Sequence, residues 1–272
     1  MKWTTKKLRQ LKSSNYTKKL SMLTCYDYQT ACALNESNID LVLVGDSLGN
    51  VILGYNTTCQ VTLQEMVIFG TAVKKGTPNK FTIIDMPFGT YASEELAIKN
   101  GIELFQKTQA EALKIEGANP QTLKSIQALI NTGIPVVGHI GLTPQFYHQQ
   151  GGYFTHGKTL DEKTTLLEQA KKLEQVGVSL LVLECITEEL ATEITKNISI
   201  PTIGIGSGPH CDGQVLVIND LLGNGPKAPP KFCSPVKNLY QDKLDAIQLY
   251  VDQINTIPHS TPEKDQYENL YS

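Results

Sequence analysis

Several short apolar runs in the sequence end in a side chain capable of acid–base or metal chemistry. The carboxyl ends of parallel strands in a barrel meet at one rim, so such residues would face one another there. A carboxylate cluster of this kind would be costly because like charges repel, and a divalent cation would relieve that cost. Oxygen ligands of this type suit Mg²⁺. A lone acid after a strand is more often a helix cap or a loop residue, but four such endings are harder to explain in that way. The residues that end these runs are Asp46, Asp85, Glu116, His139 and Glu184.

Lys114 lies two residues before Glu116 in the run ALKIE. Side chains alternate between the two faces of a strand, so both should point into the barrel, with Lys114 one layer deeper. A buried Lys beside carboxylates is either a structural counter-charge or a substrate anchor. A Schiff-base role is disfavoured, because neighbouring anions keep the amine protonated.

Arg9 is the single Arg among 24 Lys and Arg residues, and it lies outside the predicted strands. Forked recognition of a carboxylate or phosphate by a guanidinium is therefore not expected in the barrel mouth. An anionic substrate would have to be held by Lys, by backbone N–H groups or by a metal ion.

Eight short apolar runs alternate with helix-like segments, which predicts an α/β fold of the (β/α)8 TIM-barrel type. We expect one domain over residues 1–272, with an N-terminal extension at 1–19 and a polar C-terminal tail at 258–272. A doubly wound open sheet is the alternative, but the nearest Gly-rich sequence, GIGSG at 204–208, comes late and lacks the dinucleotide-binding spacing. The predicted strands cover 22–26, 40–45, 81–85, 112–116, 134–139, 179–184, 202–206 and 215–219.

Two of the predicted helices have clear boundaries. The segment 161–176 carries an apolar face and is followed by Gly177 as a C-cap. The segment 187–196 begins with Thr187 as the expected N-cap. A loop at 223–230 should lead to a final helix. The polar stretches 47–62 and 141–159 are long enough to be lids or oligomer contacts.

Composition excludes several classes of protein. The net charge of −3 offers no general attraction to nucleic acid, and no apolar segment is long enough for a membrane span or a signal peptide. The six Cys include no C-x-x-C pair and no zinc-ligand spacing, so we expect reduced thiols in a cytoplasmic protein.

The sequence resembles the ketopantoate hydroxymethyltransferase family over most of residues 20–220. The expected His and Pro are missing from 54–63, and 223–236 and the C-terminal tail match only loosely. These departures concern loop detail, because none of them touches the acidic cluster. The blocks that carry the resemblance are MLTCYDY (22–28), LVGDSLGNVILGY (43–55), TIIDMPFGTY (82–91), LKIEG (113–117), IPVVGHIGLTPQ (134–145), GGYFTHGK (151–158), LLVLECI (180–186), IPTIGIGSG (200–208) and CDGQVLV (211–217).

The resemblance implies a barrel of the phosphoenolpyruvate/pyruvate type and a one-carbon transfer in pantothenate biosynthesis. The implied reaction moves a hydroxymethyl group from the co-substrate 5,10-methylenetetrahydrofolate to 3-methyl-2-oxobutanoate through a Mg²⁺-stabilised enolate, giving 2-dehydropantoate. The implied partners are these small molecules and further copies of the chain, with a homodecamer as the suggested assembly.

The resemblance also implies roles for individual residues. Asp46 and Asp85 would bind Mg²⁺ directly and Glu116 through water. Ser47 and Lys114, together with the two aspartates, would hold the oxo acid, and Glu184 would be the catalytic base. The group that protonates the folate nitrogen is left open between Glu184 and His139, and His139 could equally be a structural residue of the rim.

Two other functions fit the same residues. One is a Mg²⁺-dependent C–C lyase or mutase that uses the same enolate chemistry on another 2-oxo acid. The other is a catalytically silent barrel, which the loss of a carboxylate would favour; all four are present.

Overall fold

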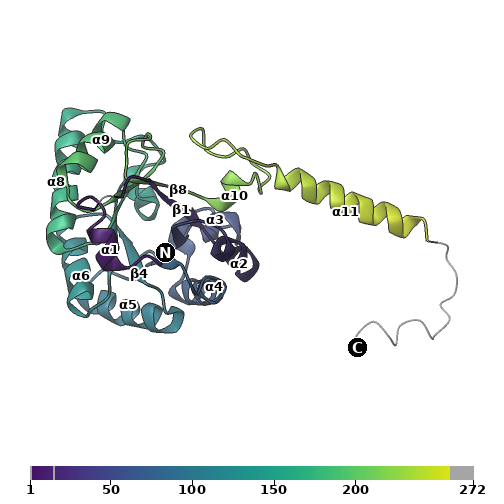
Figure 1. Ribbon diagram of the computed structural model, residues 1–272, viewed down its shortest axis with the longest axis horizontal. Coiled ribbons are helices and arrows are strands. Elements are labelled where there is room, and N and C mark those ends of the chain that lie inside the picture. The colour runs from purple at the N-terminus through teal and green to yellow at the C-terminus, as the bar shows by residue number, and fades with distance from the viewer. Residues whose placement is uncertain (1, 15, 258–272) are drawn as a thin grey trace.

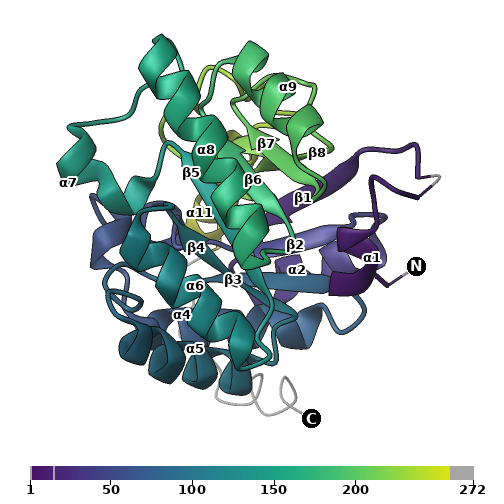
Figure 2. The ribbon, with the colours of Figure 1, turned by 90° about the vertical axis from the view of Figure 1, so that its left-hand side faces the viewer.

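The computed structural model describes residues 2–14 and 16–257, and the predicted polar tail at 258–272 lies outside the described residues. Eight parallel strands form a closed barrel in chain order, with β8 pairing back to β1 (Figures 1 and 2). The predicted (β/α)8 barrel is confirmed, and the doubly wound open sheet is excluded because the sheet has no open edge. The strands are β1 (Leu20–Thr24), β2 (Leu41–Val44), β3 (Phe81–Asp85), β4 (Ala112–Glu116), β5 (Val136–Gly141), β6 (Leu181–Glu184), β7 (Thr202–Ile205) and β8 (Gly213–Leu216).

Helices surround the barrel, and the five longest that cover it are α4, α5, α6, α8 and α9 (Figure 2). Short helices occupy the loops at its mouth, including both polar stretches that the sequence marked as possible lids. The helices are α1 (Thr5–Arg9), α2 (Tyr28–Glu36), α3 (Leu48–Val51), α4 (Leu63–Gly76), α5 (Glu94–Thr108), α6 (Pro120–Asn131), α7 (Tyr147–Gln150), α8 (Leu160–Val176), α9 (Glu188–Asn197), α10 (Ile218–Leu221) and α11 (Leu239–Asn255), with 3-10 turns η1 (Thr58–Gln60) and η2 (Pro144–Phe146).

The first and last strands begin two residues earlier than predicted. β1 pairs with β8 from Leu20 opposite Gly213, and these two positions carry the register that closes the barrel. The predicted boundaries followed apolar side chains, whereas pairing depends on backbone groups that Ser21 and Gly213 supply equally well. Ile218, predicted as strand, begins α10 instead.

Side-chain alternation divides each strand between two hydrophobic cores. On β3, Phe81 and Ile83 point into the barrel, while Ile84 packs outward against the helices. On β4, Ala112 points inward and Leu113 and Ile115 point outward. The inner core therefore fills the part of the barrel near the amino ends of the strands. The inward-facing positions beyond this core lie toward the carboxyl ends of the strands.

The N-terminal segment, predicted as an extension, closes the amino end of the barrel. Trp3, Leu8 and Leu11 are buried in the same cluster as the inward-facing strand residues. The Trp3 indole Nε1 donates to Asp40 Oδ1 at 3.0 Å. The Arg9 guanidinium donates to the carbonyl of Gly177, so it lies far from the carboxyl ends of the strands.

The two helices with predicted boundaries are confirmed with one difference in capping. α8 starts at a capping box formed by Thr159 and Glu162, and Gly177 ends it with a φ of +96°. Thr187 stands at the N-cap of α9, but its side chain makes no capping bond. Its hydroxyl instead donates to the carbonyl of Gly157 at 3.2 Å and so joins the loop before α8 to the start of α9.

The last described helix, α11, leaves the barrel and projects away from it (Figure 1). This helix confirms the predicted final helix, yet it buries no residue. Five of its large apolar side chains recur at spacings of four and three residues, so these five form one stripe along the helix. The exposed residues of the stripe are Tyr240, Leu244, Ile247, Val251 and Ile254.

Gly141 ends β5 beside the barrel mouth with a φ of +97°. A Cβ atom at this position would stand 2.2 Å from the carbonyl oxygen of Glu184, so Gly141→Ala adds a backbone clash to left-handed strain. Gly133 has a φ of +91° but open space around it, and Gly133→Ala therefore isolates the strain. We expect urea unfolding to show a loss of about 1 kcal/mol for Gly133→Ala and roughly 3 kcal/mol for Gly141→Ala. Equal losses of unfolding free energy in the two variants would contradict the predicted backbone clash.

Candidate active site

A cavity of about 370 Å³ opens at the carboxyl ends of the strands. Its wall contains every site residue that the sequence predicted, together with His139. Its floor is apolar and includes Leu43, Val182 and Val215 from the inner core. The predicted residues in its wall are Asp46, Ser47, Asp85, Lys114, Glu116 and Glu184.

Strand alternation explains why these side chains meet. Asp85 follows Phe81 and Ile83 in the same phase on β3, so it faces inward as they do. Lys114 and Glu116 share the phase of Ala112 on β4, which confirms that both lie on one face. Within these strands the polar positions are the last inward ones, where the barrel opens.

Lys114 lies among the carboxylates. Its Nζ is 3.1 Å from Asp85 Oδ2 and 3.6 Å from Glu116 Oε1, and its side chain is 5% exposed. Burial opposes its charge, but Asp85, Glu116 and Asp46 outweigh burial and raise the pKa of the ammonium group. Lys114 is therefore a protonated counter-charge in this structure, which agrees with the argument against a Schiff base.

Asp46 and Asp85 carry charge at an energetic cost. Burial raises the pKa of Asp46 well above its ordinary value, and the carboxylates of Asp85 and Glu116 add to the effect. Burial also raises the pKa of Asp85, although Lys114 opposes the shift. For Glu116, burial is outweighed by Lys114 and His139, and the pKa falls. The cluster therefore holds more negative charge than Lys114 and His139 fully stabilise.

The donor set fits a hard divalent cation. Asp85 Oδ1 is buried and has no hydrogen-bond partner within the described residues, although its Oδ2 accepts from the backbone N–H of Asp46 at 3.1 Å. Among residues 2–14 and 16–257, no group of three or more His, Cys, Asp or Glu side chains is arranged as a ready-made metal cage. Mg²⁺ is usually bound by only one or two carboxylates, with water and substrate oxygens as its other ligands. The unpartnered oxygen and the raised pKa values are compatible with that mode of binding.

His139 connects the acidic cluster to Glu184. Its Nδ1 lies 3.4 Å from Glu116 Oε1 and 3.3 Å from Lys114 Nζ, and its Nε2 lies 3.3 Å from Glu184 Oε2. The last pair is within ion-pair distance but lacks hydrogen-bond geometry, since Nε2 has no such partner within the described chain. Burial and Lys114 disfavour the imidazolium, yet Glu116 and Glu184 raise the pKa of His139 to about 9.

Ser47 follows Asp46 at the turn into α3. Its Oγ is 2.8 Å from the hydroxyl of Tyr26, which is fully buried and fixes the serine from behind. Both Ser47 and the neighbouring Asn50 line the cavity. The hydroxyl of Ser47 is thus available to an oxygen-rich ligand above the carboxylates.

Gln145 is a site residue that sequence reasoning missed. Its Nε2 donates to Asp46 Oδ2 at 2.8 Å and to the carbonyl of Met86 at 2.9 Å, and its backbone N–H donates to Glu116 Oε2 at 3.0 Å. The hydroxyl of Tyr91 donates to its Oε1 at 2.5 Å. The available signal was its place in the block IPVVGHIGLTPQ, but no local pattern shows that this residue bonds one carboxylate through its side chain and another through its backbone N–H.

The two polar stretches meet above the cavity. Cys59 Sγ lies 3.3 Å from the carbonyl of Gln145, so the loop after β2 touches the loop after β5. Thr58 and Pro144, one from each loop, line the cavity, as do Tyr153 and Phe232. Both stretches therefore roof the site. Their predicted role as lids or oligomer contacts stays a prediction.

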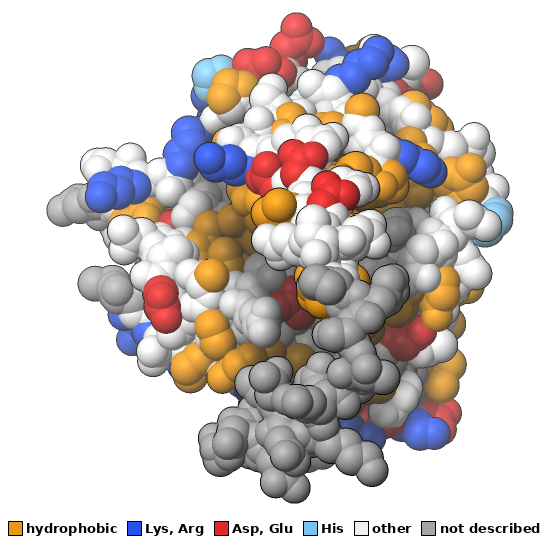
Figure 3. Space-filling view, turned by 90° about the vertical axis from the view of Figure 1, so that its right-hand side faces the viewer, with side chains coloured by type: hydrophobic (Ala, Val, Ile, Leu, Met, Phe, Trp, Pro, Cys, Tyr) orange, Lys and Arg blue, Asp and Glu red, His pale blue; other side chains and the backbone are white. Residues whose placement is uncertain are grey.

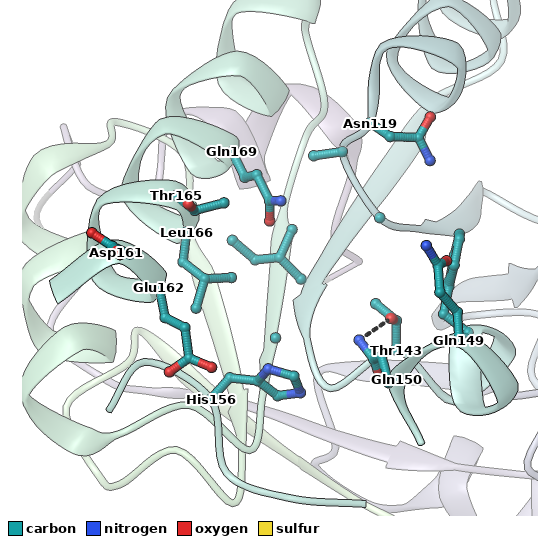
Figure 4. A pocket seen from close by; sticks show the side chains of 15 residues that line it. Asn119, Thr143, Gln149, Gln150, His156, Asp161, Glu162, Thr165, Leu166 and Gln169 are labelled. Carbon is teal, nitrogen blue, oxygen red and sulfur yellow. Dashed lines mark hydrogen bonds between the residues drawn. The ribbon is translucent and has the colours of Figure 1, made fainter. Parts of the chain in front are cut away.

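A second cavity, of about 510 Å³, lies outside the barrel wall between α6 and α8 (Figure 4). It is lined by Ile140, the outward-facing neighbour of His139, and by Asp161 and Glu162 at the start of α8. Gln150 Nε2 donates to Thr143 Oγ1 at 2.9 Å on one side of this cavity. The cavity shares no lining residue with the one that contains the carboxylates.

All six cysteines are free thiols, as the sequence predicted. Burial raises the pKa of Cys25 to about 12 and that of Cys185 to about 11. No helix in the described part of the chain has the length and hydropathy that a membrane span requires.

The sequence profile of the ketopantoate hydroxymethyltransferase family matches residues 2–260. A 3-methyl-2-oxobutanoate hydroxymethyltransferase from Thermotoga maritima is 46% identical over 263 residues, covering 94% of this chain and 97% of the relative. A protein of the same name from Legionella pneumophila strain Lens is 48% identical over 241 residues, covering 87% of this chain and 90% of the relative.

Solved structures share the fold at much lower identity. A 2,3-dimethylmalate lyase of the PEP mutase/isocitrate lyase superfamily has a TM-score of 0.64 at 14% identity, covering 96% of this chain and 89% of that chain. A phosphonopyruvate hydrolase in complex with oxalate and Mg²⁺ has a TM-score of 0.59 at 9% identity, covering 92% and 99%.

Proposed function

Since the chain belongs to the ketopantoate hydroxymethyltransferase family and is a hydroxymethyltransferase, we propose that it converts 3-methyl-2-oxobutanoate and 5,10-methylenetetrahydrofolate into 2-dehydropantoate. The observation that carries the proposal is the cavity in which Asp46, Asp85, Lys114 and Glu184 face one another. This set can bind an anionic oxo acid on one side and remove a proton on the other.

A divalent metal ion, Mg²⁺ by preference, belongs to this proposal. Asp46 and Asp85 would hold it directly and Glu116 through water, and the unpartnered Oδ1 of Asp85 supports that assignment. The phosphonopyruvate hydrolase of the same fold was solved with Mg²⁺ and oxalate, which resembles the carboxylate and oxo group of the substrate. When bound, the metal would act as a Lewis acid toward the 2-oxo group and make the C3 proton more acidic.

Lys114 and Ser47 orient the oxo acid. The buried ammonium of Lys114 places a fixed positive charge beneath the substrate, and the Ser47 hydroxyl contributes a hydrogen bond from the rim. The lone guanidinium, Arg9, is at the other end of the barrel and contributes nothing to this site. Carboxylate recognition therefore depends on Lys114 and on the acidic cluster with its cation.

Glu184 is the proposed base. It lies at the end of β6, whereas Asp46 follows β2 and Asp85 ends β3, so it approaches the substrate from another side of the barrel. His139 Nε2 lies within ion-pair distance of its carboxylate, at 3.3 Å, while the other ring nitrogen of His139 faces Glu116. His139 is thus a positioning residue in this scheme.

The proposed reaction consumes one water molecule and releases tetrahydrofolate. Glu184 takes the proton from C3, and C3 then forms a bond to the methylene carbon of the folate. That carbon leaves both folate nitrogens, water supplies the hydroxyl oxygen, and protons return to the nitrogens to give tetrahydrofolate. Glu184 in its protonated form is one donor within reach, and His139 through water is the other.

A steady-state assay tests the proposal. Purified protein with both substrates should form 2-dehydropantoate, with activity lost in a chelator and restored by Mg²⁺. The competing lyase or mutase activity would instead consume another 2-oxo acid without folate. Sequence identity favours the transferase, because relatives of that name reach 46–48% identity whereas the lyase is at 14%.

Gln145→Ala is expected to raise the Mg²⁺ and oxo-acid requirements by about 10- to 100-fold with a smaller change in kcat, because the side-chain amide orients the carboxylate of Asp46 without touching the reacting carbon. The measurement is initial rate against Mg²⁺ and against oxo acid. Gln149→Ala, at an exposed neighbour of the same chemical type, is the matched control. A fall in kcat alone would contradict an orienting role.

A homo-oligomer is also part of the proposal, with α11 as a contact between copies. The stripe from Tyr240 to Ile254 has the spacing of a helix that packs on a partner. A space-filling view of this side of the molecule shows hydrophobic side chains around a hollow (Figure 3). A cytoplasmic location is proposed with it, because the six thiols are free and free thiols persist in reducing compartments.

The double variant Ile247→Glu/Val251→Glu should reduce the assembly to a smaller species, because charges in the stripe cannot be desolvated at an interface. Light scattering after size-exclusion chromatography measures the mass and also tests the suggested decamer. Asp252→Lys changes charge outside the stripe and should leave the mass unaltered. An unchanged mass in the double variant would remove α11 from the interface.

A further inference from the structure

A third cavity, which we call the asparagine groove, adjoins the catalytic cavity. It has a volume of about 420 Å³ and lies between the loop after β2 and the loop after β8. Asn50, Val51 and Asp220 line both cavities, so the two spaces share a wall. The groove is lined by Asn50, Val51, Gly54, Tyr55, Asn56, Asn219, Asp220, Gly223, Asn224, Gly225, Pro226, Lys227, Ala228 and Pro229.

The groove carries a distinctive set of polar groups. Four side-chain amides, from Asn50, Asn56, Asn219 and Asn224, can both donate and accept hydrogen bonds. Asp220 is half-buried, accepts no hydrogen bond from another side chain within the described residues, and has a pKa raised by burial alone. These residues have no role in the scheme for the oxo acid.

We propose that the asparagine groove binds the pterin and p-aminobenzoyl portions of the folate co-substrate. The proposal rests on the proposed function, since it assigns a place to the second substrate of that reaction. It adds that the folate enters from the side of β8 and α10, with its reactive methylene directed across the shared wall toward the oxo acid.

Hydrogen-bonding chemistry supports the assignment. A pterin presents the hydrogens of its 2-amino group and N3 side by side, and a carboxylate such as that of Asp220 can accept both. The 4-oxo group and the remaining ring nitrogens match the donors and acceptors of amide side chains. Apolar side chains in the same wall, including Val51 and Pro229, suit the flat faces of the rings.

Position supports the same assignment. The methylene of the folate must reach C3 of an oxo acid held by Asp85 and Lys114. A ligand in the asparagine groove can do so, because Asn50 and Asp220 stand at the junction of the two cavities. The cavity between α6 and α8 in Figure 4 lies behind the barrel wall and shares no residue with the catalytic cavity.

Charge and size also favour the groove. The glutamate tail of a folate is anionic, and Lys227 lines the outer end of the groove while Lys243 contacts Asn224 beside it. The cavity of Figure 4 instead carries Asp161 and Glu162. Volumes of about 370 Å³ and 420 Å³ let each cavity hold one substrate, as pockets for small ligands commonly span roughly 300–1,000 Å³.

The test is calorimetric titration of the full-length protein with tetrahydrofolate. Asp220→Asn should raise Kd about 10- to 100-fold, because the variant removes the charge and replaces one of the two acceptor oxygens by an NH₂ donor that opposes the N–H groups of the pterin. Lys227→Ala should raise Kd about threefold at low salt, with the difference shrinking as salt is added. Asp161→Asn, the same change in the cavity of Figure 4, is the matched control.

A second measurement separates this proposal from the proposed function. Exchange of the C3 hydrogen of 3-methyl-2-oxobutanoate in D₂O without folate should be the same in Asp220→Asn as in the wild type. The groove assignment would be overturned if the wild type exchanges and turns over while Asp220→Asn and Lys227→Ala keep the tetrahydrofolate affinity of the wild type. Weakened binding in Asp161→Asn alone would place the folate in the other cavity. A wild type that neither exchanges nor turns over would instead refute the proposed function.

Discussion

Glu184→Gln should lower kcat by about 10²- to 10⁴-fold, the range that general-base catalysis typically contributes. The amide keeps the size of the side chain and its distance from His139, but it cannot accept a proton from carbon. Exchange of the C3 hydrogen of 3-methyl-2-oxobutanoate in D₂O should fall by a similar factor, while the KM for the oxo acid changes little. Proton NMR of the substrate measures the exchange directly and needs no folate.

Glu188→Gln provides the matched control, because Glu188 lies four residues after Glu184 and is an exposed carboxylate that pairs with His210. This variant should exchange and turn over as the wild type does. Undiminished exchange in Glu184→Gln would mean that another group is the base. Retained exchange with lost turnover would move the role of Glu184 to the folate half of the reaction.

Asp46→Asn should abolish Mg²⁺-dependent turnover, with a loss of roughly a thousandfold or more, because a metal acting as a Lewis acid contributes several kcal/mol to the barrier. The substitution preserves the shape of the side chain, and the amide oxygen of the new Asn can still accept from Gln145 Nε2. In the wild type this nitrogen lies 2.8 Å from Asp46 Oδ2. Activity that survives in the variant and resists a chelator would refute the metal site.

The same variant should be more stable than the wild type when no metal is present. Burial, Asp85 and Glu116 raise the pKa of Asp46 above its unfolded value, so the folded protein binds this proton more tightly than the unfolded chain. The stability that this proton contributes is therefore fully present below the unfolded pKa and is lost as the pH rises through the raised folded pKa, so Asp46 lowers the stability of the metal-free fold at neutral pH. Asn has no charge and avoids this cost.

Thermal unfolding at neutral pH in a chelator and in excess Mg²⁺ measures both effects. We expect a higher Tm for Asp46→Asn than for the wild type in the chelator, and a larger gain from Mg²⁺ in the wild type. A variant that is less stable without metal would show that Lys114 already compensates the charge fully. An equal gain from Mg²⁺ would show that the ion binds elsewhere.

The sequence by itself determined the barrel and the inner layer of its site. Side chains alternate between the two faces of each apolar run, so the alternation that buries Phe81 and Ile83 inside the barrel also turns Asp85 into the mouth. The inward direction of Lys114 and Glu116 followed from the same rule, whereas the absence of a guanidinium from the rim followed from the position of the single Arg, Arg9. The inward or outward direction of a side chain is local information, because the sequence of one five-residue strand is enough to predict it.

The tertiary structure alone decided how the loops complete the site. Gln145 reaches Asp46 across 99 residues of sequence, and the contact of His139 with Glu184 joins two different strands. The asparagine groove combines a loop after β2 with a loop after β8, and α11 leaves the barrel although its sequence shows an ordinary amphipathic stripe. No short-range pattern encodes such contacts, because the path of a loop depends on packing among residues far apart in the chain. Raised pKa values depend on the same packing, since burial and neighbouring charge exist only once the barrel has closed.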